Sequence, residues 1–251
     1  MADRRRGLFL SRAILSLLPK KMRFRIMREK LKISTELDPR FTFRIAKTKE
    51  ELSEAYRILH DCYVEMGFMK ENPSKMRIVK YFALPTTTTV IACYDDQVIG
   101  TLSFIRRTAL GLPMESAFNI NEAISKNEVV AEMSALAIDP RFRLKRGTVF
   151  LPFCKYFWEY LSQYMNLDGV VITVNPSMTD FYECFLDFKR LPKAEISHYE
   201  FANGHPGVGM YLNIKTVEDR MKKLYNHKPI EKNLYHYFFK LKFSIFFLPK
   251  I

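Results

Sequence analysis

The order of the predicted elements indicates an α/β fold built around one mixed sheet. Between residues 41 and 214, the chain of 251 residues alternates short β-rich runs with longer helical patterns. Hydrophobic residues make up 48% of the chain, which is ordinary for a protein that folds around a real core. The sequence contains no cysteine spacing typical of a metal site and no G-x-G-x-x-G turn, so no competing architecture is indicated.

A strand followed by a helix opens the predicted domain. Residues 41–47 alternate apolar and polar side chains with the period of a half-buried strand. Thr48 then stands three residues before a glutamate, which is the spacing of a capping box, so a helix is expected from there to about Met66. Two β-rich runs, residues 88–94 and 98–105, flank a short acidic turn and predict a hairpin.

The clearest stretch spans residues 129–160, where a strand, a basic turn and a helix follow one another. Residues 129–138 have the length and composition of a strand, with the polar Glu132 and Ser134 on the same side of the pleat. Residues 139–148 form a basic turn, and the aromatic run that follows is long enough for a helix. Because a helix N-terminus offers free N–H groups and the positive end of a dipole, this arrangement predicts an anion site.

Three further strands and a short helix complete the predicted sheet. The strands are expected at residues 170–174, 188–201 and 208–214. The short helix is expected at residues 179–186, between the first two of these strands.

The net charge of +13 is concentrated at the two ends of the chain. Residues 1–32 contain 11 Lys/Arg and 2 Asp/Glu, and residues 220–251 contain 8 and 1, so residues 33–219 carry a net charge of −3. A domain that binds nucleic acid usually concentrates its positive charge on the folded face. Nucleic acid is therefore not an expected partner.

Both basic ends also carry apolar residues, but neither predicts a membrane-spanning helix. Residues 7–18 are too few to cross a bilayer and include Arg12, and residues 234–248 are too few and too charged. An amphipathic N-terminal helix and a C-terminal helix of aromatic and lysine residues would suit a membrane surface. The alternative is that both ends pack on their own domain.

The four cysteines lie far apart in the sequence, at Cys62, Cys93, Cys154 and Cys184. Such spacing is typical of buried thiols in a reducing compartment and not of a disulfide framework. The expected location is therefore cytoplasmic, with attachment to the inner face of the membrane if the basic ends bind lipid.

The order of elements, with an arginine-rich turn ending in Gly147 before a helix, resembles the GCN5-related N-acyltransferase (GNAT) fold. The resemblance implies a mostly antiparallel central sheet with helices on both faces. In that family, the turn holds the pyrophosphate or phosphopantetheine of an acyl thioester. Gly147 and Val149 match the family's pattern, whereas Leu144 stands where Arg or Gln is usual, which argues against a plain acetyl-CoA site.

Finer motifs point to one branch of that fold. The sequence EMSALAI at residues 132–138 is similar to the Glu-x-Ser-Arg-Phe-x-Val strand of acyl-homoserine-lactone synthases, with Ala135 in place of Arg. The sequence LPME at residues 112–115 and the Asn-Pro, Phe-Tyr and Leu-Asp-Phe motifs of residues 175–188 resemble N-acyl amino acid synthases of the FeeM type. The resemblance covers roughly residues 41–214.

The resemblance implies an enzyme, an N-acyltransferase. It would move a long-chain acyl group from an acyl carrier protein or acyl-CoA thioester to the amine of an amino acid or a similar small molecule. The acyl-phosphopantetheine thioester would be a co-substrate, and no permanently bound cofactor or metal is expected. Two alternatives are a small-acyl N-acetyltransferase that uses acetyl-CoA, and a non-catalytic membrane-surface module on the same fold.

The expected organisation places a basic amphipathic N-terminal extension at residues 1–37 and the acyltransferase domain at residues 38–216. A basic, aromatic and helical C-terminal extension would occupy residues 217–251.

Two residues are expected to catalyse the transfer. Glu132 is a lone acid in an apolar strand, which is costly to bury without a partner or a purpose. It would take the proton of the amine, directly or through water; the alternative is a structural salt bridge with Arg57 or Arg106. Tyr182 matches the tyrosine that many members of the fold place near the thioester sulfur, where a phenol can protonate the leaving thiolate. The alternative for Tyr182 is a packing role.

The other expected site residues bind the acyl donor. Ser134 would hydrogen-bond the substrate or be a plain strand serine, and Asn175 would contact the pantetheine amides or cap the short helix. The remaining residues lie at the strand end and in the basic turn, where they would hold the phosphopantetheine arm and meet the acidic helix of a carrier protein: Ala137, Ile138, Arg141, Arg143, Lys145, Arg146, Gly147 and Thr148. A solvated basic loop is the alternative for the turn.

Overall fold

A computed structural model describes residues 17–143, 149–243 and 246–247, and its strands form one sheet in the order β6-β7-β5-β4-β3-β2-β1-β8. The β4–β5 and β8–β1 pairs are parallel, and the others are antiparallel. The expected mixed, mostly antiparallel sheet is therefore confirmed. The strands are β1 (Phe41–Ile45), β2 (Thr87–Tyr94), β3 (Gln97–Arg106), β4 (Val130–Ile138), β5 (Gly169–Val174), β6 (Lys189–Tyr199), β7 (His205–Asn213) and β8 (Phe246–Phe247).

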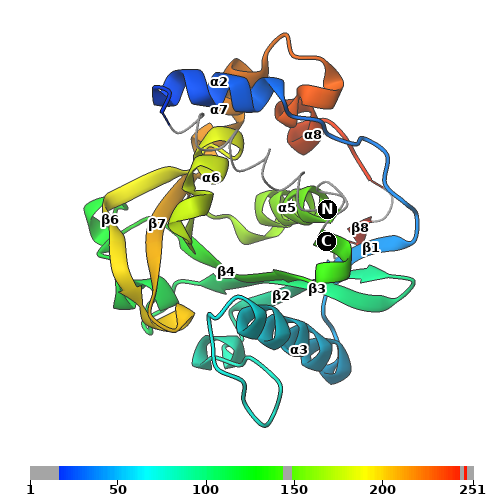
Figure 1. Ribbon diagram of the computed structural model, residues 1–251, viewed down its shortest axis with the longest axis vertical. Helices are drawn as coiled ribbons and strands as arrows, with labels where there is room; N and C mark the ends of the chain where they lie inside the picture. Colours follow the sequence, from blue (N-terminus) through cyan, green and yellow to red (C-terminus); the bar gives the residue numbers. More distant parts are fainter. Residues whose placement is uncertain (1–16, 144–148, 244–245, 248–251) are drawn as a thin grey trace.

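Helices cover both faces of the sheet. The helix α3 lies on one face, and α5 and α6 lie on the other, with α2, α7 and α8 farther out on that side (Figure 1). The helices are α2 (Lys20–Glu29), α3 (Lys49–Glu65), α4 (Pro140–Arg143), α5 (Phe150–Tyr160), α6 (Thr179–Phe185), α7 (Ile214–Tyr225) and α8 (Leu234–Phe239).

Local sequence rules set several of these elements. The Thr48 hydroxyl accepts a hydrogen bond from the Glu51 N–H at 3.2 Å, and the Glu51 carboxylate accepts one from the Thr48 N–H at 3.3 Å, so the predicted capping box starts α3. The turn between β2 and β3 places Asp95 and Asp96 at φ of 47° and 64°. Aspartate tolerates this left-handed region, which a tight hairpin turn requires.

Aromatic packing fixes α5 on the sheet. The ring of Phe157 stacks on that of Phe104 at a centroid distance of 4.0 Å, and Phe153 meets Phe43 edge-on at 5.6 Å. All four cysteines are buried and free, as expected. The helix predicted for the aromatic run is present: α5 covers Phe150–Tyr160 and passes into a π-helical turn at Leu161–Met165, which is followed by the left-handed Asn166.

The C-terminal run is not one helix, contrary to the expectation for residues 234–248. The helix α8 ends at Phe239, and β8 then joins the edge of the sheet beside β1. Burial explains the position of α8: Leu234 and Tyr237 are almost fully buried, and the ammonium of Lys155 donates to the Phe238 carbonyl at 3.1 Å. This part of the chain packs on its own domain.

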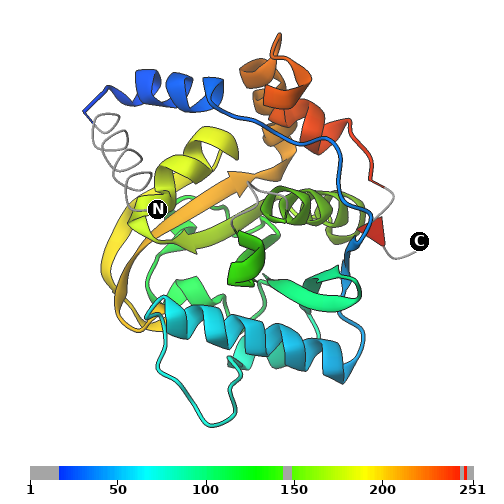
Figure 2. The same cartoon turned by 45° about the vertical axis from the view of Figure 1, so that its right-hand side comes forward.

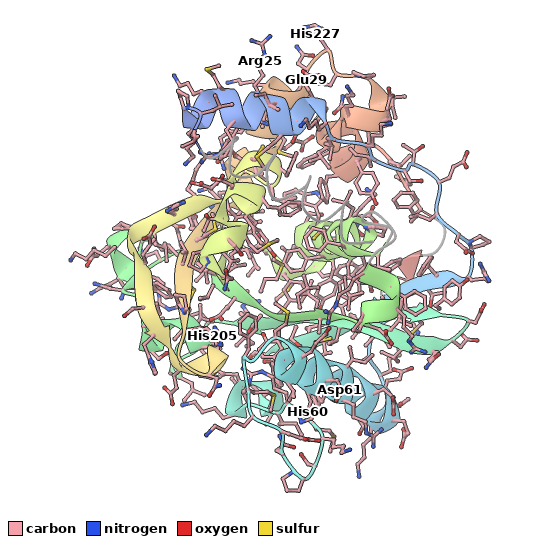
Figure 3. All side chains as sticks on the ribbon, in the orientation of Figure 1. Arg25, Glu29, His60, Asp61, His205 and His227 are labelled. Atoms are coloured by element: carbon pink, nitrogen blue, oxygen red, sulfur yellow. The ribbon has the colours of Figure 1, made fainter. Side chains whose placement is uncertain are left out.

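The N-terminal helix also packs on the domain. Both views show α2 beside α6 (Figures 1 and 2), where Phe24 is buried and the Arg23 guanidinium pairs with Asp180 at 2.7 Å. Arg25 points away from the domain (Figure 3). Some of the basic residues of the N-terminal segment therefore attach α2 to the domain. Residues 1–16, which include most of the expected amphipathic run, lie outside the described residues. Within the described ranges, no helix has the length and apolarity to cross a membrane.

Candidate active site

A cavity opens where two neighbouring parallel strands separate. The strands β4 and β5 pair only between Val130–Glu132 and Gly169–Val171, after which β4 follows β3 and β5 follows β7. Beyond that point lies a cavity of about 400 Å³. Its walls come from both strands, the end of α3, the segment before β2, and the turn between β6 and β7. Parting strands leave main-chain groups of both edges free to bond a ligand.

Glu132 lies at the point where the strands part. Its side chain borders the cavity, although the residue is only 2% exposed. Burial raises its pKa to about 8, and Glu115 adds to the rise, while a hydrogen bond from the Met114 N–H opposes it. Glu132 has no salt-bridge partner among the described residues, and Arg57 pairs with Glu54 on the surface of α3 instead. The alternative of a structural salt bridge with Arg57 or Arg106 is thus wrong.

The LPME segment supports Glu132 from the neighbouring loop. The Met114 N–H donates to Oε2 of Glu132 at 2.8 Å, and Met114 is fully buried. Glu115 holds this turn in place, because its carboxylate accepts from the Leu112 N–H at 2.8 Å and pairs with Arg107 at 2.5 Å. The LPME segment, which is one of the motifs behind the family resemblance, therefore positions the main-chain donor that bonds Glu132.

A β-bulge shapes the strand after Glu132. Ala135 adopts a left-handed conformation with φ of 63°, and residues 135 and 136 together stand opposite Leu102 of β3. Bulges of this kind disturb the hydrogen-bond ladder and redirect main-chain groups. Ser134, just before the bulge, also borders the cavity, so the structure brings Ser134 and Glu132 to the same site as the alternation predicted.

Tyr182 and Asn175 border the cavity from α6 and from the end of β5. Tyr182, on α6, borders the cavity while its ring meets Phe188 edge-on at 5.7 Å, and burial holds the pKa of its phenol above the ordinary value. Asn175 borders the cavity too, but its carbonyl oxygen accepts from the Ser177 N–H at 3.0 Å and the Ser177 hydroxyl at 2.8 Å. Asn175 thus caps the turn after β5, and its NH₂ group remains available for a ligand.

The basic turn lies beyond the end of β4. Arg141 pairs with Asp139 at 2.6 Å, and Arg143 donates to the Ile138 carbonyl at 2.7 Å and pairs with Glu65 at 2.9 Å. Neither these two arginines nor Ala137 and Ile138, which precede them in the chain, border the cavity. The remaining predicted residues of the turn, Lys145, Arg146, Gly147 and Thr148, lie outside the described residues.

Several cavity residues escaped the sequence analysis. Tyr63 and Arg77 come from the end of α3 and from the loop after it, and Tyr199 and Phe201 come from the end of β6 and the turn after it. The Arg77 guanidinium lies over the Tyr63 ring, 4.3 Å from its centroid, and its Nη2 donates to the Phe201 carbonyl at 2.7 Å. No pattern of spacing marks these residues, because they meet only through the fold.

The histidines near the cavity are held by other contacts. Figure 3 shows His60 and Asp61 on α3, where the two side chains contact each other at 2.8 Å, and His205 at the start of β7. The His205 ring meets Phe68 edge-on at 5.1 Å and does not border the cavity. In the part of the chain that the structure describes, no group of three or more His, Cys, Asp or Glu residues gathers as a metal site would require.

Comparison with known families gives one match. The family described as N-acyl amino acid synthase FeeM matches residues 54–213, a range that contains Glu132, Tyr182 and both strands of the cavity. None of the curated proteins matches the sequence.

Three of the solved structures that share the fold illustrate the likeness. FeeM, an N-acyl amino acid synthase from uncultured soil microbes, is 22% identical, with a TM-score of 0.61 over 72% of this chain and 94% of that chain. The AHL synthase LasI is 18% identical, with a TM-score of 0.52 over 69% and 90% of the two chains. BjaI, a CoA-dependent acyl-homoserine lactone synthase, is 15% identical, with a TM-score of 0.55 over 72% and 89%. These likenesses establish the GNAT-like fold.

Proposed function

Because the chain belongs to the FeeM family of N-acyl amino acid synthases and is an acyltransferase, we propose that it transfers a long-chain acyl group from a phosphopantetheine thioester to the amine of an amino acid. The observation that carries this proposal is the environment of Glu132. A buried acid with a pKa of about 8 and no ionic partner among the described residues borders the cavity where β4 and β5 part. Such an acid is suited to accept a proton from an amine near neutral pH.

The reaction requires two proton transfers. Glu132 accepts a proton from the neutral amine as the amine nitrogen attacks the thioester carbonyl. The C–N bond forms as the C–S bond breaks, and the Tyr182 phenol, which its raised pKa keeps protonated, donates its proton to the departing sulfur. The products are an amide and a free thiol, and solvent returns both side chains to their starting protonation states.

The donor arm would lie between the parted strands. The free edges of β4 and β5 offer main-chain groups to the pantetheine amides, and Ser134 and Asn175 add side-chain hydrogen bonds from the cavity wall. The bulge at Ala135 supports this placement, since it turns main-chain groups out of the β3–β4 ladder, where they can polarise the thioester carbonyl.

The phosphate end of the arm would reach the basic turn, passing Ala137 and Ile138. Arg141 and Arg143 hold surface ion pairs, which are worth only about 0–1 kcal/mol each, so a phosphate can replace their present partners. Lys145, Arg146, Gly147 and Thr148 continue the same basic segment. A carrier protein with an acidic helix would meet these same residues, which makes either a carrier protein or coenzyme A a suitable donor.

The acyl chain would enter a second, apolar cavity on the α5 side of the sheet. That cavity is about 50 Å³ and is lined by side chains of α5, α7 and α8, such as Phe157, Met221 and Phe238. Met133 borders both cavities and is the one described residue that does so. Because methionine is unbranched and has three rotatable bonds, it can move aside for an alkyl chain. The cavity has room for a few methylene groups, so a longer chain has to widen it. Its apolar lining favours an alkyl donor.

The test is a product assay with the full chain. Purified protein is given acetyl-CoA, palmitoyl-CoA or palmitoyl carrier protein with a mixture of amino acids, and products are identified by mass while thiol release is followed. We expect acylated amino acids from the palmitoyl donors, and a loss of about 10²- to 10⁴-fold in rate for Glu132→Gln. Glu54→Gln, an exposed carboxylate on α3, is the matched control and should retain its rate.

Other outcomes lead to other conclusions. Full activity of Glu132→Gln contradicts the assigned mechanism. A preference for acetyl-CoA identifies a small-acyl N-acetyltransferase, and absence of thiol release from every donor favours the non-catalytic module.

A further inference from the structure

The cavity contains two residues of opposite charge type that do not pair. Arg77 and Glu132 are the only Arg, Lys, Asp or Glu side chains among its described lining residues. Both residues influence Tyr63. The Arg77 guanidinium lies over the Tyr63 ring, 4.3 Å from its centroid. Burial raises the pKa of the Tyr63 phenol; the charge of Glu132 adds to the rise, and Arg77 opposes it. Within the described part of the chain, Arg77 and Glu132 form no ion pair, and no cation is among the groups that influence the pKa of Glu132.

The hydrogen-bond inventory of Arg77 is incomplete. A guanidinium has five N–H donors in a planar fork. In Arg77, Nη2 donates to the Phe201 carbonyl and the guanidinium also interacts with the Tyr63 phenol, while Nε is buried without a hydrogen-bond partner among the described residues. No carboxylate of the described residues forms an ion pair with it. Leaving a partly buried cation and a buried donor unsatisfied is costly, which favours a bound anion at this position.

We propose that Arg77 binds the carboxylate of the acceptor, so that the acceptor is an amino acid with a free carboxylate and not a polyamine or a simple amine. This inference rests on the proposed function. In an α-amino acid, the carboxylate and the amine are attached to one carbon, so a molecule held by Arg77 keeps its amine in the cavity that Glu132 also borders. Arginine suits this task because its fork matches the two oxygens of a carboxylate. A polycation would be repelled at the same place.

The stacking of Arg77 on Tyr63 supports a fixed orientation. The aromatic face and the bond to the Phe201 carbonyl restrain the guanidinium plane from two sides. The main-chain N–H of Arg77 donates to the Tyr56 carbonyl at 3.0 Å, which ties the loop to α3. The group is thus held in place before any acceptor binds, which reduces the entropy lost on binding.

Binding measurements test the inference without requiring turnover. The full chain, with and without coenzyme A, is titrated calorimetrically with L-phenylalanine, L-leucine and their carboxamides, which suit the apolar and aromatic walls of the cavity. We expect each acid to bind more tightly than its amide by on the order of 10- to 100-fold, and Arg77→Gln to abolish that difference while leaving amide binding unchanged. Arg77→Lys, which keeps the charge but loses the fork, should retain part of the preference.

The control is Arg57→Gln, which removes an exposed arginine of α3 and should change neither affinity. Thermal unfolding of each variant verifies that it folds. Equal binding of acid and amide by the unaltered chain, no binding of either, or an unchanged preference in Arg77→Gln each overturns the inference.

Turnover separates this inference from the proposed function. If phenethylamine is acylated as well as phenylalanine, acyl transfer stands and the role of Arg77 fails. If the acids bind selectively through Arg77 but no donor is consumed, the carboxylate site stands and the proposed function fails.

Discussion

The main-chain N–H of Met114 donates to the Glu132 carboxylate at 2.8 Å, although 18 residues separate the two in the sequence. This bond stabilises the ionised form of an acid whose burial favours the neutral form. The result is a pKa of about 8, well above the ordinary value of 4.5 but still within reach of neutral pH. The turn of residues 113–116 thus adjusts the proton affinity of the residue that we propose as the base.

The pH dependence of the rate should report Glu132. Since only the ionised carboxylate can accept the amine proton, kcat/KM is expected to rise with pH and to level off above about pH 8. The amine of the acceptor also loses its proton in this range, so the residual profile of Glu132→Gln serves as the control. An identical profile in the two proteins would mean that the acceptor alone titrates.

Stability should also depend on the ionisation of Glu132. Its pKa in the folded chain is about 8, against 4.5 ordinarily, so the folded chain binds more protons than the unfolded chain between these values. The free energy of unfolding should therefore fall as pH rises through this window, by at most about 1.4 kcal/mol for each pH unit from this group. Urea unfolding of Glu132→Gln should lack this decline. Parallel curves for both proteins would contradict the raised pKa.

Replacement of Tyr182 should slow the departure of the thiol. Tyr182→Phe keeps the ring that packs on Phe188 but removes the proton donor, and we expect about a 100-fold loss of rate with a coenzyme A thioester. With an aryl thioester, whose thiolate leaves without being protonated, Tyr182→Phe should recover most of the lost rate. Tyr235→Phe on α8 is the control. A rate loss of the same size with both thioesters would assign Tyr182 a packing role.

Met133 should govern the accepted chain length. Because it borders both cavities, Met133→Phe places a rigid ring at the passage between them. We expect kcat/KM for a palmitoyl donor to fall at least about tenfold, while that for an acetyl donor changes little. Met22→Phe, on the exposed side of α2, controls for the added bulk. Equal losses for both donors would indicate that the chain follows another route.

Much of the fold follows from local signals in the sequence. The capping box at Thr48 and the acidic turn at Asp95 depend on neighbouring residues alone, so the helix and the hairpin were predictable from short segments. The family resemblance, carried by residues 112–115, 132–138 and 175–188, is likewise a property of the linear sequence and is confirmed by the family match. The chemical roles of Glu132 and Tyr182 stay predictions.

Other features depended on contacts that no local pattern encodes. The terminal segments combine basic and apolar residues that suit either a membrane surface or the domain itself, and only the burial of Phe24 and Tyr237 shows that α2 and α8 pack inward. The expected alternative of a salt bridge between Glu132 and Arg57 also depended on a distant contact. It is wrong because Arg57 lies on the exposed side of α3.

The order of strands and helices, the α/β class and the family can be read from the amino-acid sequence, because periodicity, caps and turns act over a few neighbouring residues. The point where β4 and β5 part, the donor that bonds Glu132, and the meeting of Arg77 and Tyr63 at one cavity follow from the three-dimensional fold alone. These relationships join residues far apart in the chain. They arise from packing of the whole sheet and its helices, which is where burial, and with it the pKa of Glu132, is set.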